Sequence, residues 1–145
     1  MPNSGFESPT PQVVRSERLS QRGAVLIIDG ELDLDSASQL GTEIAVRIEE
    51  GHRHLVIDLT DATFLDSVAM ATLLSAVAPL RTEPDAAVVL AGSDGVVARA
   101  LEVSGIGRLF TRFDTREGAI AGLHDDPERL IEVWRRVGGA RPGAG

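Results

Sequence analysis

The sequence predicts an α/β domain in which helices pack on a parallel or mixed sheet. Short apolar runs typical of buried strands recur along the chain, and a stretch with the apolar spacing of a helix follows each of the first three. The clearest example is residues 55–74, where an apolar run passes through an acidic segment into helical spacing. With 145 residues, the chain is long enough for one ordinary domain and too short for two.

The composition limits the classes of partner. Hydrophobic residues make up 43% of the chain and charged residues 25%, proportions that allow a folded core and argue against global disorder. A formal net charge of −8 without a basic stripe argues against nucleic acid or an anionic membrane as the main partner, and favours a protein or a small ligand. The absence of cysteine excludes disulfides, thiolate metal sites and thiol nucleophiles.

The chain shows no recognisable targeting segment. Residues 1–12 lack both the basic and the apolar region of a signal peptide, and no apolar run approaches the ~20 residues needed to span a bilayer. We therefore expect a cytoplasmic protein without a membrane span.

The N-terminal part is expected to form an arm followed by strands. Residues 1–11 hold three prolines among small polar residues and predict a flexible arm. An edge strand is expected to begin at residues 13–14. The apolar residues 24–28 predict the first buried strand, which Asp29 and Gly30 are expected to end.

A helix is expected to follow this strand. Ser36 and Gln39 have the spacing of a capping box, in which the two side chains satisfy free N–H groups at the helix start. Apolar positions continue to Glu50, and Gly51 is a natural C-terminal stop.

The second unit begins at His54. Its strand is expected to be buried on both faces, because apolar residues follow one another without a break in residues 55–57. An acidic loop is expected up to Asp66, and a helix is expected to begin near Ser67. Pro79 lacks an N–H group and is expected to end or kink that helix.

The remaining elements continue the alternation. Residues 86–91 predict a third buried strand, and residues 92–94 offer caps for a helix that residues 104–105 close. Residues 109–113 predict a last short strand, and residues 115–123 predict a short helix.

Residues 127–137 predict one further helix. Pro127 suits a position in the first turn, and the apolar face of the helix needs a surface to cover it. Two alternatives are open: the face docks on the domain, or it contacts a partner or a second copy, which would give a dimer through this helix. Residues 143–145 are expected to fray. The apolar face comprises Leu130, Ile131, Trp134 and Val137.

Four acidic residues near two strand ends raise the question of a metal site. Asp33 follows the first buried strand, and Asp58, Asp61 and Asp66 lie at the end of the second. Oxygen ligands suit Mg²⁺ or Ca²⁺, but the spacing matches neither an EF-hand loop nor a nucleotide motif, and such residues more often cap helices or face water. We therefore expect no metal. The sequence also has three scattered histidines, which without cysteine are only weak evidence for a zinc site: His52, His54 and His124.

Ser67 stands at the junction between the second strand and its helix. A catalytic nucleophile is not expected there, because LDSVA lacks both glycines of the G-x-S-x-G elbow and no histidine has a convincing triad position. We therefore expect no enzyme activity. Two uses of the junction stay open: Asp66 or Ser67 caps the helix, or Ser67 carries a regulatory phosphate.

The regulatory alternative rests on charge. A phosphate on Ser67 would add about −1.5 to −2 charges at a helix N-terminus that can accommodate an anion, so the fold should survive. A partner packed on this turn would face a hydrated dianion beside Asp33 and Asp66. Repulsion between like charges and the cost of desolvation would then weaken the complex.

Three segments together resemble the STAS-domain anti-sigma factor antagonists. GELD at residues 30–33, LVIDLTDATFLDS at residues 55–67 and LEVSGIGRLFTRFDTREGAIAGL at residues 101–123 follow in the order and at the spacing typical of that family. The resemblance covers most of the chain. The expected organisation is a flexible N-terminal arm, a STAS domain, and a C-terminal helix with a flexible tail, at residues 1–11, 12–124 and 125–145.

The resemblance implies a mixed, mostly parallel sheet of four to five strands with packed helices. It also implies a partner, an anti-sigma factor that is a serine kinase, which the unphosphorylated antagonist captures and thereby frees the sigma factor for transcription. Phosphorylation of the Ser after the motif Asp releases the kinase, and a PP2C-type phosphatase restores the antagonist. The matching Ser is Ser67, and the implied partner-binding residues are Asp33, Asp66, Ser67 and Val68. ATP would belong to the kinase, so this chain need bind no cofactor.

The sequence departs from the family pattern at two places. Val68 and Ala69 replace the small hydroxyl residue and the Gly that usually follow the phosphoacceptor, which reduces backbone freedom and is expected to alter the approach of the kinase. The helix of Trp134 lies beyond the usual end of the domain. One alternative function stays open, an unphosphorylated STAS adaptor subunit of a lipid-transport or stress-signalling complex in which Ser67 is only a cap.

Overall fold

The structure, a computed structural model, describes residues 11–92 and 95–139. The expected caps Ser93 and Asp94, the expected frayed end, and all but the last residue of the expected N-terminal arm lie outside these ranges.

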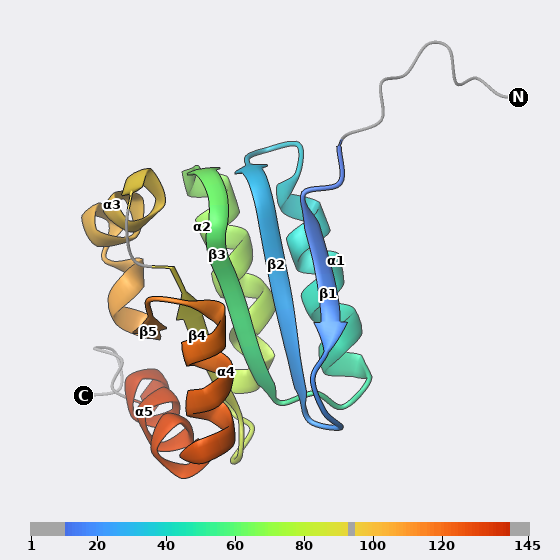
Figure 1. Ribbon diagram of the computed structural model, residues 1–145, viewed down its shortest axis with the longest axis vertical. Helices are drawn as coiled ribbons and strands as arrows, with labels where there is room; N and C mark the ends of the chain where they lie inside the picture. Colours follow the sequence, from blue (N-terminus) through green and yellow to red (C-terminus); the bar gives the residue numbers. More distant parts are fainter. Residues whose placement is uncertain (1–10, 93–94, 140–145) are drawn as a thin grey trace, which may run out of the picture.

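A five-stranded sheet forms the centre of the fold (Figure 1). Its strands, in spatial order, are β1 (Val14–Arg18), β2 (Gly23–Leu32), β3 (His54–Leu65), β4 (Ala87–Ala91) and β5 (Thr111–Phe113). β1, at one edge, runs antiparallel to β2, and the other neighbouring pairs are parallel. The predicted mixed, mostly parallel sheet is therefore confirmed.

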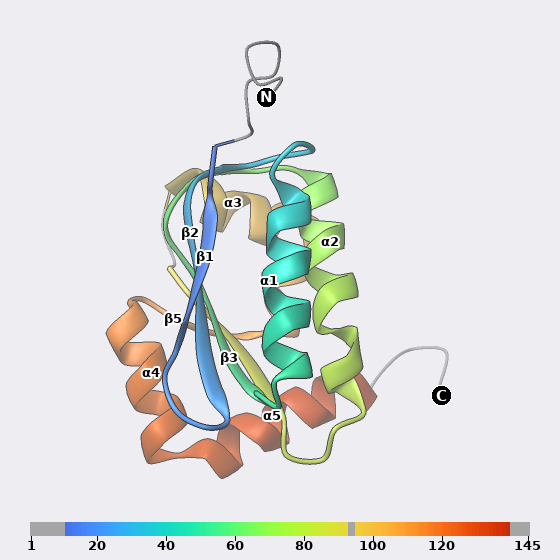
Figure 2. The same cartoon turned by 90° about the vertical axis from the view of Figure 1, so that its right-hand side faces the viewer.

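Helices lie on both faces of this sheet. The helical elements are α1 (Ala37–Glu49), α2 (Ser67–Val77), the 3₁₀ turn η2 (Ala78–Arg81), α3 (Gly95–Ser104), the 3₁₀ turn η3 (Ile106–Leu109), α4 (Arg116–Asp125) and α5 (Pro127–Gly139). Figure 2 shows α1 and α2 side by side on one face and α4 on the other. None of these helices is long and apolar enough to cross a membrane.

The central strands are buried because helices cover both of their sides. In β2, Val25, Leu26, Ile27 and Ile28 are each at most 1% exposed. All five residues of β4 are buried as well. These continuous apolar runs are typical of strands covered on both faces, as the sequence predicts.

The expectation that Asp29 and Gly30 end β2 is wrong. The strand continues to Leu32, and its pairing with β3 shifts register on each side of the Asp29–Gly30 step. Gly30 has a φ of 114°, a backbone region that glycine enters without the penalty of a side chain. The irregularity therefore bends the strand without ending it.

The expected acidic loop before Ser67 is wrong for most of its length. β3 extends to Leu65, which is paired with Leu32 of β2. Because β2 offers backbone partners this far, residues 60–65 stay in the sheet even though most of their side chains are exposed. The connection between β3 and α2 is reduced to Asp66.

The expected capping box at the start of α1 is also wrong. Ser36 occupies the N-cap position, but its side chain makes no cap hydrogen bond. Gln39 reaches away from the helix start, and its Oε1 accepts hydrogen bonds from the N–H groups of Val13 at 2.7 Å and Val14 at 3.1 Å. The long amide side chain thus ties the beginning of β1 to α1, a contact between distant segments that local spacing does not encode.

The last strand is shorter than predicted. Residues 106–109 form η3, so β5 begins only at Thr111. The following helix α4 begins after Thr115, whose side chain accepts a hydrogen bond from the N–H of Gly118 at 2.9 Å.

α5 docks on the domain, the first of the two alternatives for its apolar face. Leu130 is 7% exposed and Trp134 is 3% exposed. The indole Nε1 of Trp134 donates a hydrogen bond to the carbonyl oxygen of Leu80 at 2.9 Å, and the guanidinium of Arg81 lies 3.6 Å from the ring centroid. The ring of Phe110 lies beside the indole, with centroids 5.7 Å apart.

Candidate functional site

The sheet brings two of the predicted site residues to one edge. β2 ends at Leu32 and β3 ends at Leu65, and these two residues are paired. Asp33 and Asp66, the next residue of each chain segment, therefore begin neighbouring connections at the same end of the sheet (Figure 1). A hydrogen bond of 3.3 Å from the N–H of Asp66 to the carbonyl oxygen of Leu32 joins the two connections.

Asp66, and not Ser67, caps α2. Asp66 has an extended backbone, with φ −95° and ψ 179°, and its Oδ1 accepts a hydrogen bond from the N–H of Ala69 at 2.8 Å. Ser67 is the first residue of the helix and is exposed. Within the part of the chain that the structure describes, the Ser67 hydroxyl makes no hydrogen bond, so it is free to meet another molecule.

Asp33 shapes the neighbouring turn. Its Oδ1 accepts hydrogen bonds from the N–H groups of Asp35 at 3.0 Å and Ser36 at 3.1 Å. The backbone hydrogen bond from Ser36 is the main cause that lowers the pKa of Asp33, outweighing a smaller opposing effect of burial. Asp33 therefore stays negatively charged beside the start of α2.

Three large apolar side chains are exposed on the segments around Ser67. Leu34 in the connection after β2 is 70% exposed, and Phe64 near the end of β3 and Val68 in the first turn of α2 are each 42% exposed. We call Leu34, Phe64 and Val68 the apolar trio. Sequence reasoning singled out Val68 and missed the other two, although an apolar residue between Asp33 and Asp35 is a signal that could have found Leu34.

The outer face of α2 is an open surface. A shallow hollow there is lined by Ser67, Val68, Ala71, Thr72 and Ser75. The hydroxyl of Thr72 is already used, since it donates to the carbonyl oxygen of Val68 at 2.8 Å. A shallow face with exposed apolar and hydroxyl groups suits a protein surface better than a small ligand, which needs a deeper cleft.

Val68 and Ala69 fit the helix without strain. Both belong to α2, and no described residue other than glycine has a positive φ. Ala69 is fully buried and donates its N–H to Asp66. The turn as it stands therefore does not need the backbone freedom of the glycine that this family pattern usually has.

The acidic residues of the strands do not gather around a common centre. Asp58 is 1% exposed and accepts hydrogen bonds from Arg116 and from the N–H and hydroxyl of Thr60, at 3.0 and 2.7 Å. Its contact with Arg116 raises the pKa of that guanidinium. Asp61 is exposed. In residues 11–92 and 95–139, no group of three carboxylate or histidine side chains is placed to hold a metal ion.

The three histidines lie in different surroundings. His52 is 2% exposed, whereas the ring of His54 lies 3.0 Å from the carbonyl oxygen of Asp85. The exposed His124 lies beside Asp125.

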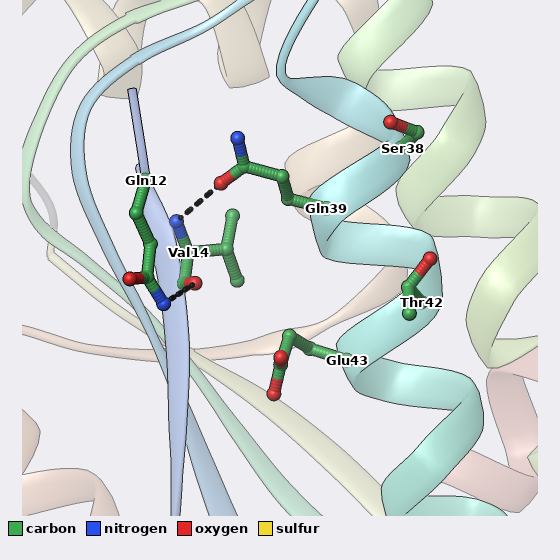
Figure 3. Close-up of a pocket in the computed structure, with 6 residues that line it drawn as sticks. All are labelled: Gln12, Val14, Ser38, Gln39, Thr42 and Glu43. Carbon is green, nitrogen blue, oxygen red and sulfur yellow. Dashed lines mark hydrogen bonds between the residues drawn. The ribbon is translucent and has the colours of Figure 1, made fainter. Parts of the chain in front are cut away.

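A second hollow lies between the edge strand β1 and α1 (Figure 3). Here Gln39 accepts from the N–H of Val14, while Nε2 of Gln12 donates to the carbonyl oxygen of Val14 at 3.4 Å. Because side chains already occupy these backbone groups, the hollow protects a sheet edge and offers little to a ligand. Its lining residues are Gln12, Val14, Ser38, Gln39, Thr42 and Glu43.

Comparison with known proteins identifies the family. The family model described as the STAS domain matches residues 10–119, most of the chain. The chain belongs to the STAS domain family. α5 of this STAS protein lies wholly beyond the matched residues.

Relatives of this STAS protein are named as antagonists of anti-sigma factors. The anti-sigma-F factor antagonist RsfB of Mycobacterium tuberculosis is 33% identical over 100 residues, a match that covers 69% of this chain and 80% of the relative.

Solved structures confirm the STAS fold. The anti-sigma factor antagonist SpoIIAA in its unphosphorylated form superposes with a TM-score of 0.67 and 20% identity, covering 77% of this chain and 96% of SpoIIAA. An anti-sigma factor antagonist from Mycobacterium paratuberculosis superposes with a TM-score of 0.65 and 26% identity, covering 77% of this chain and 93% of the other.

Proposed function

We propose that this STAS protein is an anti-sigma factor antagonist whose capture of its partner is switched by phosphorylation of Ser67. The named relatives support the first half of the proposal, because RsfB and the Mycobacterium paratuberculosis protein carry that description. The second half rests on the geometry around Ser67 and on the sequence motif that ends there.

One observation carries the switch: the helix cap is supplied by Asp66, which leaves the Ser67 hydroxyl exposed and free of hydrogen bonds to the described residues. A residue needed as a cap could not be modified without loss of the helix start. Ser67 can be modified without loss of the cap, because Asp66 forms the cap. The helix N-terminus also tolerates the negative charge that a phosphate brings.

The phosphate would act on the complex and not on the fold. It adds about −1.5 to −2 charges beside Asp33 and Asp66, two carboxylates at the same edge of the sheet. A partner that covers the apolar trio would have to bury this charge or lose contact. We infer that the unphosphorylated form binds the anti-sigma factor and that the phosphorylated form is released.

The proposed partner is also the kinase that phosphorylates Ser67. An anti-sigma factor that is a serine kinase would bring ATP, and the Ser67 oxygen would take the terminal phosphoryl group while ADP leaves. A PP2C-type phosphatase would hydrolyse the phosphate and restore capture. The proposed contact residues on this chain are Asp33, Asp66, Ser67 and Val68.

The test is a phosphorylation assay with the cognate kinase and ATP, read by intact mass. Wild type should gain one phosphate and Ser67→Ala should gain none. Ser75→Ala is the matched control, because Ser75 is exposed on the same helix and lines the same hollow. Phosphate found on a serine other than Ser67 would refute the site.

Partner capture is tested separately by pull-down. Wild type and Ser75→Ala should retain the anti-sigma factor, and Ser67→Asp should lose most of it because the charge mimics the phosphate. Equal capture by Ser67→Asp and wild type would contradict the switch. Co-purification with membrane-transport subunits in the absence of phosphorylation would favour the adaptor alternative.

The cytoplasmic location and a dimer through α5 stay predictions.

A further inference from the structure

A small pocket near β5, the edge strand opposite β1, is lined by two arginines. It lies where α3, η3 and β5 meet and is lined by Leu101, Glu102, Gly107, Arg108 and Arg112. Its volume of about 180 Å³ is below the ~300 Å³ at which pockets for drug-sized ligands begin. The space suits one small ion or one ionic group. We call it the Arg112 pocket.

Arg112 is the unusual residue of this pocket. It lies in β5, paired with Leu90 of β4, and its side chain is partly buried. Its Nε is buried and has no hydrogen-bond partner, and within residues 11–92 and 95–139 its guanidinium has no ion pair. A buried donor on a charged group is costly unless an acceptor meets it, so the position calls for an acceptor.

The backbone makes room for this guanidinium. A Cβ placed on Gly107 would lie 3.2 Å from Nη1 of Arg112 and 3.3 Å from Cβ of Leu101. The absence of a side chain at Gly107 therefore lets the guanidinium lie close against η3.

Arg108 supplies a second positive charge. Its side chain is exposed and lines the same pocket. The pocket also holds one carboxylate, Glu102, yet no ion pair within 4.0 Å joins Glu102 to either arginine in the described part of the chain. The two guanidiniums therefore outnumber the carboxylate, and neither is neutralised by it.

Most of the other described arginines have a partner. Six described arginines lie within 4.0 Å of a carboxylate oxygen: Arg22, Arg47, Arg53, Arg116, Arg135 and Arg136. Arg81 instead lies over the Trp134 ring. With a net charge of −8, carboxylates are plentiful. Among the described residues, the arginines outside this pocket that have neither an ion pair nor a ring contact are all exposed, whereas the unpaired guanidinium of Arg112 is partly buried. The exposed ones are Arg15, Arg18, Arg99 and Arg129.

We propose that the Arg112 pocket binds a phosphate group, held by the guanidiniums of Arg112 and Arg108. A guanidinium presents its N–H groups as a planar fork that matches two oxygens of a phosphate, and two such forks suit a group with about two negative charges. The source is inorganic phosphate or the phosphate of a small metabolite. This proposal goes beyond the Ser67 switch and does not depend on it.

The test is an NMR titration of the full chain with sodium phosphate, at constant ionic strength maintained with sodium chloride. Saturable shifts are expected for the backbone amides of α3, η3 and β5. Arg112→Gln and Arg108→Gln should each weaken the affinity at least tenfold. Arg99→Gln is the matched control, because Arg99 is exposed on α3 outside the pocket lining, and it should bind like wild type.

Three results would overturn the proposal. One is the absence of saturable shifts, and another is a response to acetate as strong as that to phosphate. The third is unchanged affinity in the two variants. Because Arg108 is exposed, Arg108→Gln keeps the test decisive if Arg112→Gln fails to fold. Phenyl phosphate in a parallel titration distinguishes the sources: binding as strong as that of the inorganic ion supports a metabolite phosphate, and exclusion supports the free ion.

Discussion

Asp66 and Ser67 are neighbours in the chain with separate roles at the start of α2. The Asp66 carboxylate closes the first turn, and the Ser67 hydroxyl points to no partner among the described residues. The extended backbone of Asp66 decides this division, because it sets that residue outside the helix, where its side chain can reach the N–H of Ala69. The helix cap and the proposed phosphorylation site are therefore different side chains.

Val68 is expected to contribute to partner capture. Val68→Glu places a charge in the apolar trio, and the change suits the first turn of a helix, so the fold should be kept. We expect at least a tenfold loss of affinity for the anti-sigma factor, about 1.4 kcal/mol, measured by calorimetry. Val103→Glu on α3 is the control, since Val103 is 80% exposed, and it should bind normally. Unchanged affinity of Val68→Glu would remove Val68 from the interface.

Asp58 is expected to stabilise the fold. Asp58→Asn leaves Arg116 without its counter-charge, and breaking a buried pair costs about 3–5 kcal/mol. Because Arg116 is 30% exposed, we expect the free energy of unfolding in urea to fall by the lower end of that range or less. The exposed Asp61→Asn should change it by less than ~0.5 kcal/mol. Equal effects of the two substitutions would show that the pair does not stabilise the chain.

Ser67, Asp66 and Asp58 show how much of the site could be predicted from the sequence. The motif and the strand-to-helix junction predicted Ser67, and its position at the start of α2 is confirmed. Which of Asp66 and Ser67 forms the cap stayed open, because both residue types cap helices. The role of Asp58 was out of reach, because its partner Arg116 is 58 residues away along the chain.

At the scale of elements, α5 is an addition to the STAS domain that is integrated into the core. Trp134 connects it to η2 through the Leu80 carbonyl oxygen and the Arg81 guanidinium. Burial of that guanidinium lowers the pKa of Arg81, and the indole face provides the compensating contact. Because η2 directly follows α2, docking of α5 also fixes the C-terminal end of the helix that begins at Ser67.

Trp134→Ala should destabilise the domain strongly. Removing a buried tryptophan costs about 3–5 kcal/mol, since a cavity remains and the Leu80 carbonyl oxygen loses its donor. Thermal and urea unfolding should both report the loss. The matched surface control is Arg135→Ala, in the same helix with a side chain 60% exposed, and it should have little effect. A loss below ~1 kcal/mol for Trp134→Ala would mean that α5 is only loosely attached.

Element boundaries were predictable where residue types act locally. Gly51, with a φ of 101°, follows the end of α1, and Pro79 lies where α2 gives way to η2, both as the sequence predicts. The far ends of β2 and β3 were not predictable, because acidic, exposed residues stay in a sheet only when a neighbouring strand pairs with them. The surface on which α5 docks was not predictable either, because Leu80 is 54 residues away from Trp134 along the chain.

The whole molecule is expected to lose stability below neutral pH through His52. This side chain is 2% exposed and its Nδ1 is buried without a hydrogen-bond partner. Burial, together with the charge of Arg47, lowers the pKa of His52 from its ordinary 6.5. In the unfolded chain the histidine regains its ordinary pKa and takes up a proton first. Stability is therefore complete above pH ~6.5 and falls as the pH drops toward the lowered pKa.

A denaturation series from about pH 7.5 to about pH 5 tests this expectation. Wild type should lose up to about 1.4 kcal/mol for each pH unit, the limit for one proton. His52→Gln should show a flatter profile, and His124→Gln, altered at an exposed residue, should follow wild type. Asp33 does not interfere, because its pKa lies below the ordinary 3.8. Parallel profiles for wild type and His52→Gln would exclude His52 as the cause.

The position of Trp134 gives the protein an optical probe of its own. The chain has a single tryptophan and no tyrosine, so its ultraviolet emission comes almost entirely from this indole. In the folded protein the ring is screened from water beneath Arg81 and beside Phe110. Detachment of α5 would move the emission toward longer wavelengths, and a spectrum of the unlabelled protein can follow that single event in the presence of any partner that lacks tryptophan.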